Sequence, residues 1–114
     1  MGWRGIDLDG TLAVHEFDSS HPTHLGPPVE KMLGRVKEFL SEGWEVKIMT
    51  ARVASSQPEE QRAAQHSAIR AWCKKHVGVA LEATAEKDFN MIDLWDDRAV
   101  QIVRDTGVRA DGKA

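Results

Sequence analysis

The chain has 114 residues, with 15 basic and 18 acidic side chains and a formal net charge of −3 at pH 7. This length suits one compact domain and is too short for two. The near balance of charges argues against a general nucleic-acid-binding surface. No apolar run of about 18 residues could span a membrane, and the first residues lack the form of a secretory signal. Because the single cysteine cannot form an internal disulfide, we expect a cytoplasmic protein.

Four predicted elements fill the first half of the chain. Residues 3–9 form a strand in which an apolar stretch leads to two acids. Residues 13–27 contain turn formers and no helical period, which predicts a loop or flap. Pro28 opens a helix that ends near Gly43, because its apolar residues follow the helical period and glycine favours a helix end. Residues 44–49 then form a second strand.

A long helix is predicted next. Ser55 or Ser56 caps it, Pro58 lies in its first turn, and it runs to about His76. Its clearest apolar edge includes Cys73, which we interpret as a small core residue. A reactive thiol is the alternative.

Short strands are predicted over residues 77–81 and 91–95, followed by an amphipathic helix over residues 98–106 and a frayed tail to Ala114. This order is typical of an α/β domain with a mostly parallel central sheet. Right-handed crossovers place helices on both faces, so we expect one Rossmann-like three-layer domain over residues 1–114, without a cap domain. In such sheets, ligands bind beyond the carboxyl ends of the strands.

The most informative segment follows the first predicted strand and reads Asp7-Leu8-Asp9-Gly10-Thr11-Leu12. Side chains alternate along an extended chain, so Asp7 and Asp9 point to the same side, and Gly10 then allows a sharp turn. Paired carboxylates repel each other unless a cation, such as a divalent metal ion, lies between them. The alternatives are a surface turn and a calcium loop ending at Asp18, although the apolar residues after Thr11 leave such a loop short of oxygen ligands.

Three further polar clusters accompany the later strands. Thr50 ends the second strand, Lys87 precedes the last strand, and Asp96 and Asp97 follow it. Each has a structural alternative: Thr50 could cap a turn, a lysine of the preceding helix could take the place of Lys87, and the two acids could cap a helix.

In this order, the clusters resemble the four motifs of the haloacid dehalogenase (HAD) superfamily of phosphatases. The resemblance covers residues 3–104, and residues 7–11 match the Asp-x-Asp-Gly-Thr motif without a departure. Thr50 matches the second motif, Lys87 the third, and residues 96–97 the acidic fourth. The resemblance implies a magnesium-dependent hydrolase of phosphate monoesters that acts through an aspartyl-phosphate.

The resemblance also implies a role for each residue. Asp7 attacks phosphorus, and Asp9 protonates the leaving oxygen and then activates water. Thr50 and Lys87 hold the phosphoryl oxygens. The implied Mg²⁺ ligands are Asp7, the backbone carbonyl of Asp9, and one or both of Asp96 and Asp97. Superfamily branches that lack an acid at the position of Asp9 are dehalogenases and transport ATPases, so Asp9 favours phosphate-ester hydrolysis.

The chain has no interval long enough for a cap domain, so it resembles the minimal, capless members. An open site cannot enclose a small metabolite unaided. Either the substrate is large, such as a nucleic-acid end or a phosphoprotein, or a neighbouring subunit of a homo-oligomer covers the site. The flap carries His15, His21 and His24, which are either solvated or face the substrate, with a zinc site as the alternative.

Arg52 lies two residues beyond Thr50, and its planar guanidinium suits a second phosphate or a carboxylate. The alternative is an outward-facing surface arginine. We count Arg52 and Thr11 among the residues expected to meet the substrate. Residues 50–52 and 96–99 also resemble the phosphatase module of polynucleotide kinase/phosphatases, which implies a terminal phosphate of a nucleic acid or nucleotide, although the acidic net charge gives this no support.

Two other classes of protein share parts of this pattern. A non-catalytic phosphate-binding module would keep the fold, but Asp9 would have little purpose in it. A phosphotransfer receiver domain also combines clustered acids with a threonine and a lysine. Its phosphorylated aspartate ends the third strand, however, where this chain has no acid. The phosphatase is therefore the main hypothesis.

Overall fold

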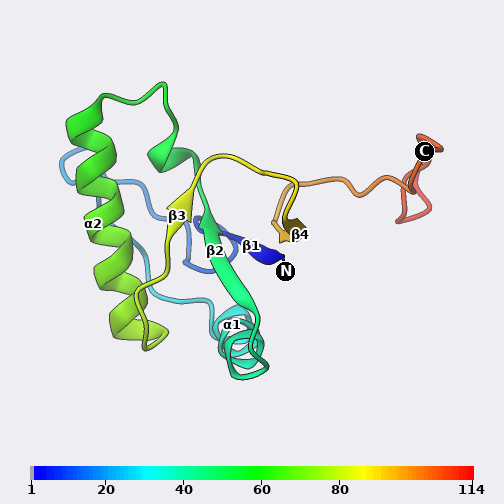
Figure 1. Cartoon of the computed structure of the whole chain (residues 1–114). Helices are drawn as coiled ribbons and strands as arrows, with labels where there is room; N and C mark the ends of the chain where they lie inside the picture. Colours follow the sequence, from blue (N-terminus) through cyan, green and yellow to red (C-terminus); the bar gives the residue numbers. More distant parts are fainter. Residues whose placement is uncertain (1) are drawn as a thin grey trace.

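The computed structural model describes residues 2–114, and a parallel sheet of four strands forms its centre (Figure 1). The strands are β1 (Trp3–Asp7), β2 (Glu45–Met49), β3 (Ala83–Thr84) and β4 (Met91–Trp95). They lie in the order β3-β2-β1-β4, so β1 pairs with both β2 and β4. Because all pairs are parallel, the carboxyl ends of the strands meet at the same edge of the sheet.

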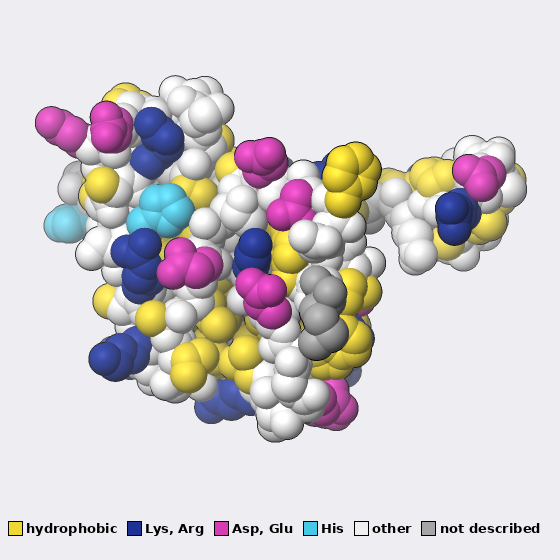
Figure 2. All heavy atoms as spheres, in the orientation of Figure 1, with side chains coloured by type: hydrophobic (Ala, Val, Ile, Leu, Met, Phe, Trp, Pro, Cys, Tyr) yellow, Lys and Arg dark blue, Asp and Glu magenta, His cyan; other side chains and the backbone are white. Residues whose placement is uncertain are grey.

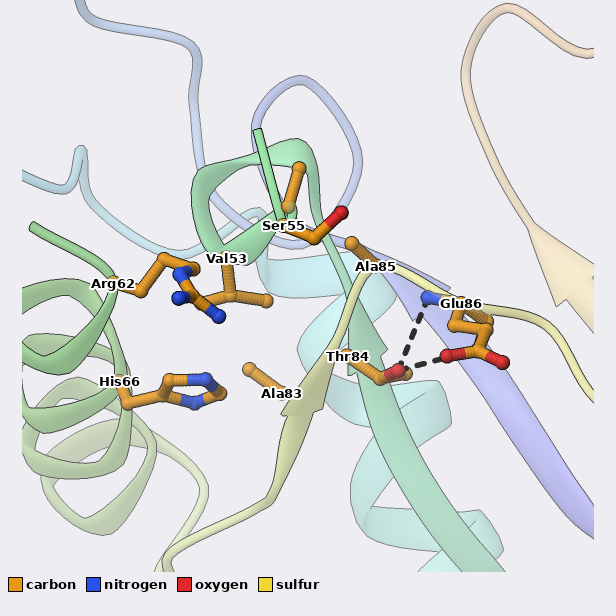
Figure 3. A pocket seen from close by; sticks show the side chains of 9 residues that line it. Val53, Ser55, Arg62, His66, Ala83, Thr84, Ala85 and Glu86 are labelled. Atoms are coloured by element: carbon orange, nitrogen blue, oxygen red, sulfur yellow. Dashed lines mark hydrogen bonds between the residues drawn. The ribbon is translucent and has the colours of Figure 1, made fainter. Parts of the chain in front are cut away.

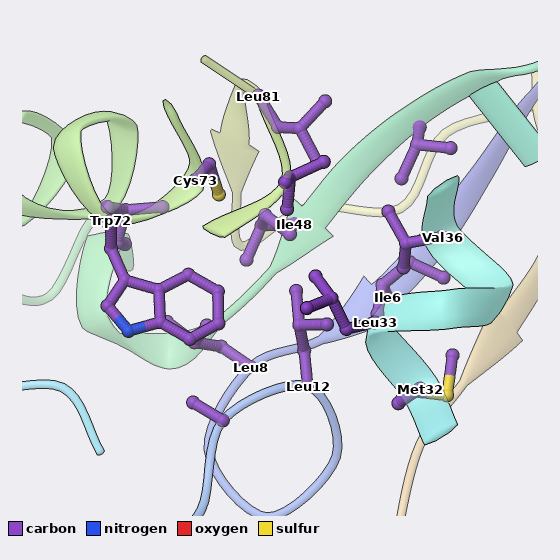
Figure 4. Close-up of a cluster of buried hydrophobic side chains, with 14 of the residues drawn as sticks. Ile6, Leu8, Leu12, Met32, Leu33, Val36, Ile48, Trp72, Cys73 and Leu81 are labelled. Atoms are coloured by element: carbon purple, nitrogen blue, oxygen red, sulfur yellow. The ribbon is translucent and has the colours of Figure 1, made fainter. Parts of the chain in front are cut away.

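Both helices, α1 (Glu30–Ser41) and α2 (Glu59–His76), pack on one face of the sheet. This face carries Ile6 and Ile48, which lie opposite each other and are fully buried. Figure 4 shows side chains of both helices around this pair. The labelled members of the cluster are Ile6, Leu8, Leu12, Met32, Leu33, Val36, Ile48, Trp72, Cys73 and Leu81. Burial of this apolar surface holds the helices and the sheet together.

The α/β class, the parallel sheet and the absence of a cap domain are confirmed for the described residues. The prediction of helices on both faces is wrong for this part of the chain. A layer on the second face would need the helix predicted over residues 98–106, and that helix does not form. The sheet therefore has helices on one face only.

Residues 99–114, here called the C-terminal arm, form an extended segment with a β-hairpin instead of a helix. The Val103 amide donates to the Val108 carbonyl at 2.7 Å, and the Ala110 amide donates to the Gln101 carbonyl at 2.9 Å. The turn between these residues contains Asp105 and Gly107, both at positive φ. β-Branched residues favour extended backbone, which explains why this apolar segment pairs rather than coils. The arm projects from the body as a separate lobe (Figures 1 and 2).

Two predicted boundaries also change. The third strand forms at Ala83–Thr84 rather than over residues 77–81, because Val77 and Leu81 are buried in the core without pairing as a strand. Helix α2 begins at Glu59, and its N-terminal cap is Pro58, so neither Ser55 nor Ser56 caps it.

The predicted flap, residues 13–27, is confirmed as a loop that contains no helix. Among the described residues, neither helix combines the length and the apolar character needed to cross a membrane.

Candidate functional site

Three carboxylates converge where β1 and β4 end. Asp7 is the last residue of β1, and Asp96 and Asp97 directly follow β4, the neighbouring strand. One carboxylate oxygen from each residue lies within 4.8 Å of those of the other two. We call this group the acidic triad. Within residues 2–114, it is the only cluster of three or more Asp, Glu, His or Cys side chains with a geometry that could hold a metal ion.

The turn after β1 supports the triad. The Thr11 hydroxyl lies 3.1 Å from Asp7 Oδ2 and 3.2 Å from Asp97 Oδ1, so it connects the two carboxylates. Gly10 adopts φ +90°, and a Cβ there would lie 2.9 Å from Asp97 Oδ2. Glycine is therefore required both for the turn and for the approach of Asp97. Thr11, predicted to meet the substrate, lies beside the triad.

The crowding of carboxylates changes their protonation. The pKa of Asp7 is raised to about 7, first by burial, then by the hydrogen bond to Asp97, and further by the negative charges of Asp96 and Asp97. The same hydrogen bond lowers the pKa of Asp97. As the pH falls, Asp7 therefore takes up a proton before Asp97 does. A bound cation would replace that proton.

Asp9 lies apart from the triad and pairs with Arg52. Arg52 Nε donates to Asp9 Oδ2 at 2.8 Å, and Nη2 donates to Oδ1 at 2.9 Å, which is the bidentate geometry of a strong ion pair. The two residues are far apart in sequence, and both side chains are mostly buried. The two acids of the first motif therefore have different partners: Asp7 belongs to the triad and Asp9 to an ion pair.

Arg52 also holds the flap. Its Nη1 donates to the Pro22 carbonyl at 3.3 Å and to Gln65 Oε1 at 3.1 Å, and its Nη2 donates to the His24 carbonyl at 2.9 Å. Together with the two bonds to Asp9, these contacts occupy all five N–H groups of the guanidinium. In this arrangement Arg52, predicted to meet the substrate, has no donor left for it.

Helix α2 anchors the flap at two further points. Gln65 Nε2 donates to the Pro22 carbonyl at 2.7 Å, and the Trp72 indole N–H donates to the Gly26 carbonyl at 3.0 Å. These bonds satisfy main-chain carbonyls in a segment that has no regular secondary structure.

The flap histidines do not gather into a metal site. His21 Nδ1 lies 3.0 Å from Asp18 Oδ2, and His24 Nε2 lies 2.8 Å from Glu16 Oε1. Neither these two nor His15 belongs to a metal-binding cluster among residues 2–114. Asp18, the last ligand position of the alternative calcium loop, lies outside the acidic triad as well.

Thr50 is buried at the end of β2, and its hydroxyl accepts a hydrogen bond of 3.2 Å from the Arg52 amide. It therefore caps the short 3₁₀-helix η1 (Ala51–Val53). This agrees with the alternative that Thr50 caps a turn. The cap uses a lone pair of the hydroxyl oxygen, so the hydroxyl proton remains available to another acceptor.

Two members of the triad, Asp7 and Asp96, line a cavity of about 310 Å³. Its lining residues are Asp7, Asp9, Thr50, Ala51, Arg52, Asp96 and Arg98. Arg98, which was not predicted as a site residue, lines this cavity, and its place directly after the acidic pair was a usable signal. Lys87 does not line this cavity. It lines a separate cavity with its neighbours Glu86, Asp88 and Phe89, so the structure does not bring Lys87 to the triad.

A second cavity, of about 520 Å³, lies between α2 and the end of β3 (Figure 3). Arg62 and His66, one helical turn apart on α2, point into it. The segment that follows β2 lines both this cavity and the cavity beside Asp7: residues 50–52 line the cavity beside Asp7, and residues 53–55 line this one. Arg62 and His66 were not predicted as site residues, although their spacing of one helical turn was an available signal.

Comparisons of the chain with family models, with curated proteins and with solved structures found no match.

Proposed function

We propose that this chain is a magnesium-dependent phosphate monoester hydrolase in which Asp7 is the nucleophile. The observation that carries the proposal is the acidic triad at the carboxyl ends of the adjacent strands β1 and β4, beside a cavity that also contains Thr50. Open α/β sheets bind ligands at this edge. The order of the motifs, which resembles that of the HAD phosphatases, is a second line of support.

The donor set of the triad suits Mg²⁺. Mg²⁺ prefers oxygen ligands at about 2.0–2.1 Å, so ligands on opposite sides of the ion lie about 4 Å apart. The triad oxygens lie within 4.8 Å of one another, so small movements of these side chains would complete the site. Asp7, Asp96 and Asp97 would hold the ion, together with the Asp9 carbonyl that the resemblance implies. When bound, the ion supplies the positive charge that lets a phosphate approach these carboxylates.

In the reaction we propose, an oxygen of Asp7 forms a bond to phosphorus while the bond from phosphorus to the ester oxygen breaks. Asp9 donates a proton to that oxygen, and then takes a proton from the water that hydrolyses the aspartyl-phosphate. Since both oxygens of Asp9 accept hydrogen bonds from Arg52, neither carries a proton, so this ion pair must separate and Asp9 must take up a proton from solvent before it can donate one. Arg52 is therefore a positioning residue in our scheme.

Thr50 and Arg98 are the cavity residues best suited to the phosphoryl oxygens. The free hydroxyl proton of Thr50 can donate to one oxygen, and the Arg98 guanidinium offers a planar set of donors. Lys87 matches the third motif of the HAD phosphatases, which implies that it holds phosphoryl oxygens, but it does not line the cavity. We expect Arg98→Gln to lower kcat/KM more than Lys87→Gln does.

The test is hydrolysis of an aryl phosphate with and without Mg²⁺. Activity that requires Mg²⁺, is abolished in Asp7→Asn and falls by about 10²–10⁴-fold in Asp9→Asn supports the proposal. Asp111→Asn, in the C-terminal arm, is the matched control and should retain full activity. Absence of turnover in the unaltered chain across sugar phosphates, nucleotides, oligonucleotide ends and phosphopeptides would sink it.

The Asp9–Arg52 pair also favours a second candidate, a phosphate-binding module without turnover, because the general acid is engaged and Lys87 does not line the cavity. Phosphate binding by the unaltered chain with no product release would select this candidate. The second cavity, with Arg62 and His66, favours a large substrate that carries a further anionic group, such as a nucleotide. Preferential hydrolysis of nucleotides within the panel would identify that class.

A further inference from the structure

The cavity between α2 and β3, here called the Arg62–His66 cavity, lies at the same edge of the sheet as the acidic triad. β3 pairs with β2, and all strands are parallel, so their carboxyl ends share this edge. Residues 83–86, at the end of β3, and residues 53–55, after β2, form part of its lining. Its volume of about 520 Å³ is that of a ligand pocket. A substrate held at the triad can therefore extend into it.

Arg62 offers this cavity a set of free donors. Its side chain is half-buried, and its Nε donates to the Gln57 carbonyl at 3.1 Å, which orients the guanidinium. Within residues 2–114, its two terminal nitrogens donate to no other residue. Arg52, by contrast, has all five N–H groups engaged. Arg62 is therefore better placed than Arg52 to bind a second phosphate of the substrate.

His66 lies one helical turn further along α2 and points into the same cavity (Figure 3). Its Nδ1 is buried and has no hydrogen-bond partner among the described residues. A buried polar atom without a partner destabilises the folded chain, and a role in ligand binding is one physical reason for keeping it. Because no hydrogen bond holds this nitrogen, the ring can turn and present an N–H group to an anion beside Arg62.

The rest of the wall suits the uncharged part of such a ligand. Four small apolar side chains line it: Val53, Ala54, Ala83 and Ala85. The one acid, Glu86, lies across the cavity from the two α2 side chains (Figure 3). Its main chain is fixed, because the Thr84 hydroxyl accepts from the Glu86 amide and donates to the Glu86 carbonyl. The cavity is thus cationic on the α2 side only.

We propose that the Arg62–His66 cavity binds a second phosphate group, carried by the leaving alcohol of the substrate. This inference rests on the proposed function. Asp9, the proposed donor to the leaving oxygen, is paired with Arg52 of η1, so the leaving alcohol lies on the η1 side of the cavity beside Asp7. The three residues of η1 span about 6 Å, a distance that one sugar ring can bridge. The substrate class is therefore a bisphosphate of a sugar or nucleoside.

The first test compares phosphate release from adenosine 3′,5′-bisphosphate, adenosine 5′-monophosphate and adenosine 3′-monophosphate with Mg²⁺. We expect kcat/KM to be at least about tenfold higher for the bisphosphate, mainly through a lower KM. Arg62→Gln should remove this preference. Arg70→Gln is the matched control, because Arg70 lies on the same helix, is 49% exposed and does not line the cavity. Equal kcat/KM for the three nucleotides, or a preference that Arg62→Gln leaves unchanged, would overturn the proposal.

A second measurement does not depend on turnover. The imidazole nitrogen signals of His66, identified by their loss in His66→Gln, are followed by NMR during titration with inorganic phosphate in the presence of a chelator. We expect a saturable shift that exceeds the shift in chloride of equal ionic strength, is lost in Arg62→Gln and is retained in Arg70→Gln. Circular dichroism of each variant checks that the fold is retained.

The two measurements separate this inference from the proposed function. Hydrolysis of the monophosphates without a shift at His66 would leave the proposed function intact and reject the second phosphate site. A saturable shift in a chain that hydrolyses none of the nucleotides would retain the phosphate site and reject the proposed function.

Discussion

Asp9 and Arg52 hold each other through two hydrogen bonds, of 2.8 and 2.9 Å, and the same guanidinium holds the flap carbonyls of Pro22 and His24. The side chains of Arg52 and Asp9 are 16% and 23% exposed, so water screens the pair only in part. This contact couples the first motif, the end of β2 and the flap. A change at Arg52 should therefore affect stability as well as the site.

Arg52→Lys keeps the positive charge but loses the planar fork and most of its hydrogen bonds. We expect the free energy of unfolding to fall by about 2 kcal/mol, which is typical of hydrogen bonds to charged groups in partly buried positions. Urea unfolding at pH 7 measures this change. Arg104→Lys, at a 95% exposed position, is the control and should change little. Equal stability of the two variants would show that the ion pair contributes nothing.

Gly10→Ala should destabilise the protein and disturb the triad, because alanine at φ +90° is strained and its Cβ would lie 2.9 Å from Asp97 Oδ2. The cost of the left-handed backbone alone is about 1–2 kcal/mol. Gly34→Ala, inside α1, is the opposite case, because nothing lies within 4 Å of the added Cβ. It should stabilise the chain by about 0.5–1 kcal/mol. Thermal or urea unfolding of both variants distinguishes these outcomes.

The raised pKa of Asp7, about 7 against an ordinary 3.8, predicts how stability without divalent metal depends on pH. Between these two values the folded state binds a proton that the unfolded state has lost. The contribution of Asp7 to the free energy of unfolding should therefore be highest below pH 3.8. It should fall as the pH rises to about 7 and level off above that pH. Asp97 has a lowered pKa, so its effect lies at more acidic pH, outside this interval.

Urea unfolding from pH 4.5 to pH 8.5, in the presence of a chelator, measures this dependence. Asp7→Asn should remove the slope across this interval, and the control Asp111→Asn should retain it. A slope of the opposite sign in the unaltered chain would mean that Asp7 is ionised throughout.

Cys73 should not react with thiol reagents in the folded protein. It is fully buried, and burial raises the pKa of its thiol to about 11, so very little thiolate is present at pH 8. Labelling by a disulfide reagent should proceed only as fast as the chain unfolds, and should become rapid in denaturant. An exposed Val79→Cys substitution provides a rapidly reacting control. Fast labelling of Cys73 itself would support the alternative of a reactive thiol.

Much of the fold followed from local sequence patterns. The apolar period of α1 and the strands that begin at Trp3 and Met91 were predictable, because each pattern acts within a few residues, although the first strand ends at Asp7 and not at the predicted residue 9. The meeting of Asp7 with Asp96 and Asp97 was also predictable, since parallel strands end at a common edge.

The remaining features depend on contacts between distant segments. Asp9 and Arg52 are 43 residues apart, and their pairing requires the flap to lie against α2, which no local pattern encodes. Residues 98–106, at the start of the arm, were predicted as an amphipathic helix. The turn through Asp105 and Gly107 and the β-branched residues on either side favoured a hairpin instead.

Gln65 and Trp72, which anchor the flap to α2, constrain the number of residues between them along the helix. Gln65 and Trp72 are seven positions apart, close to two helical turns, so their side chains leave the helix on the same side and reach the Pro22 and Gly26 carbonyls together. One inserted residue between them would rotate the second anchor by about 100° and leave a carbonyl without its donor. Homologues that keep this loop should therefore vary in length within residues 16–21 and conserve the spacing along the helix.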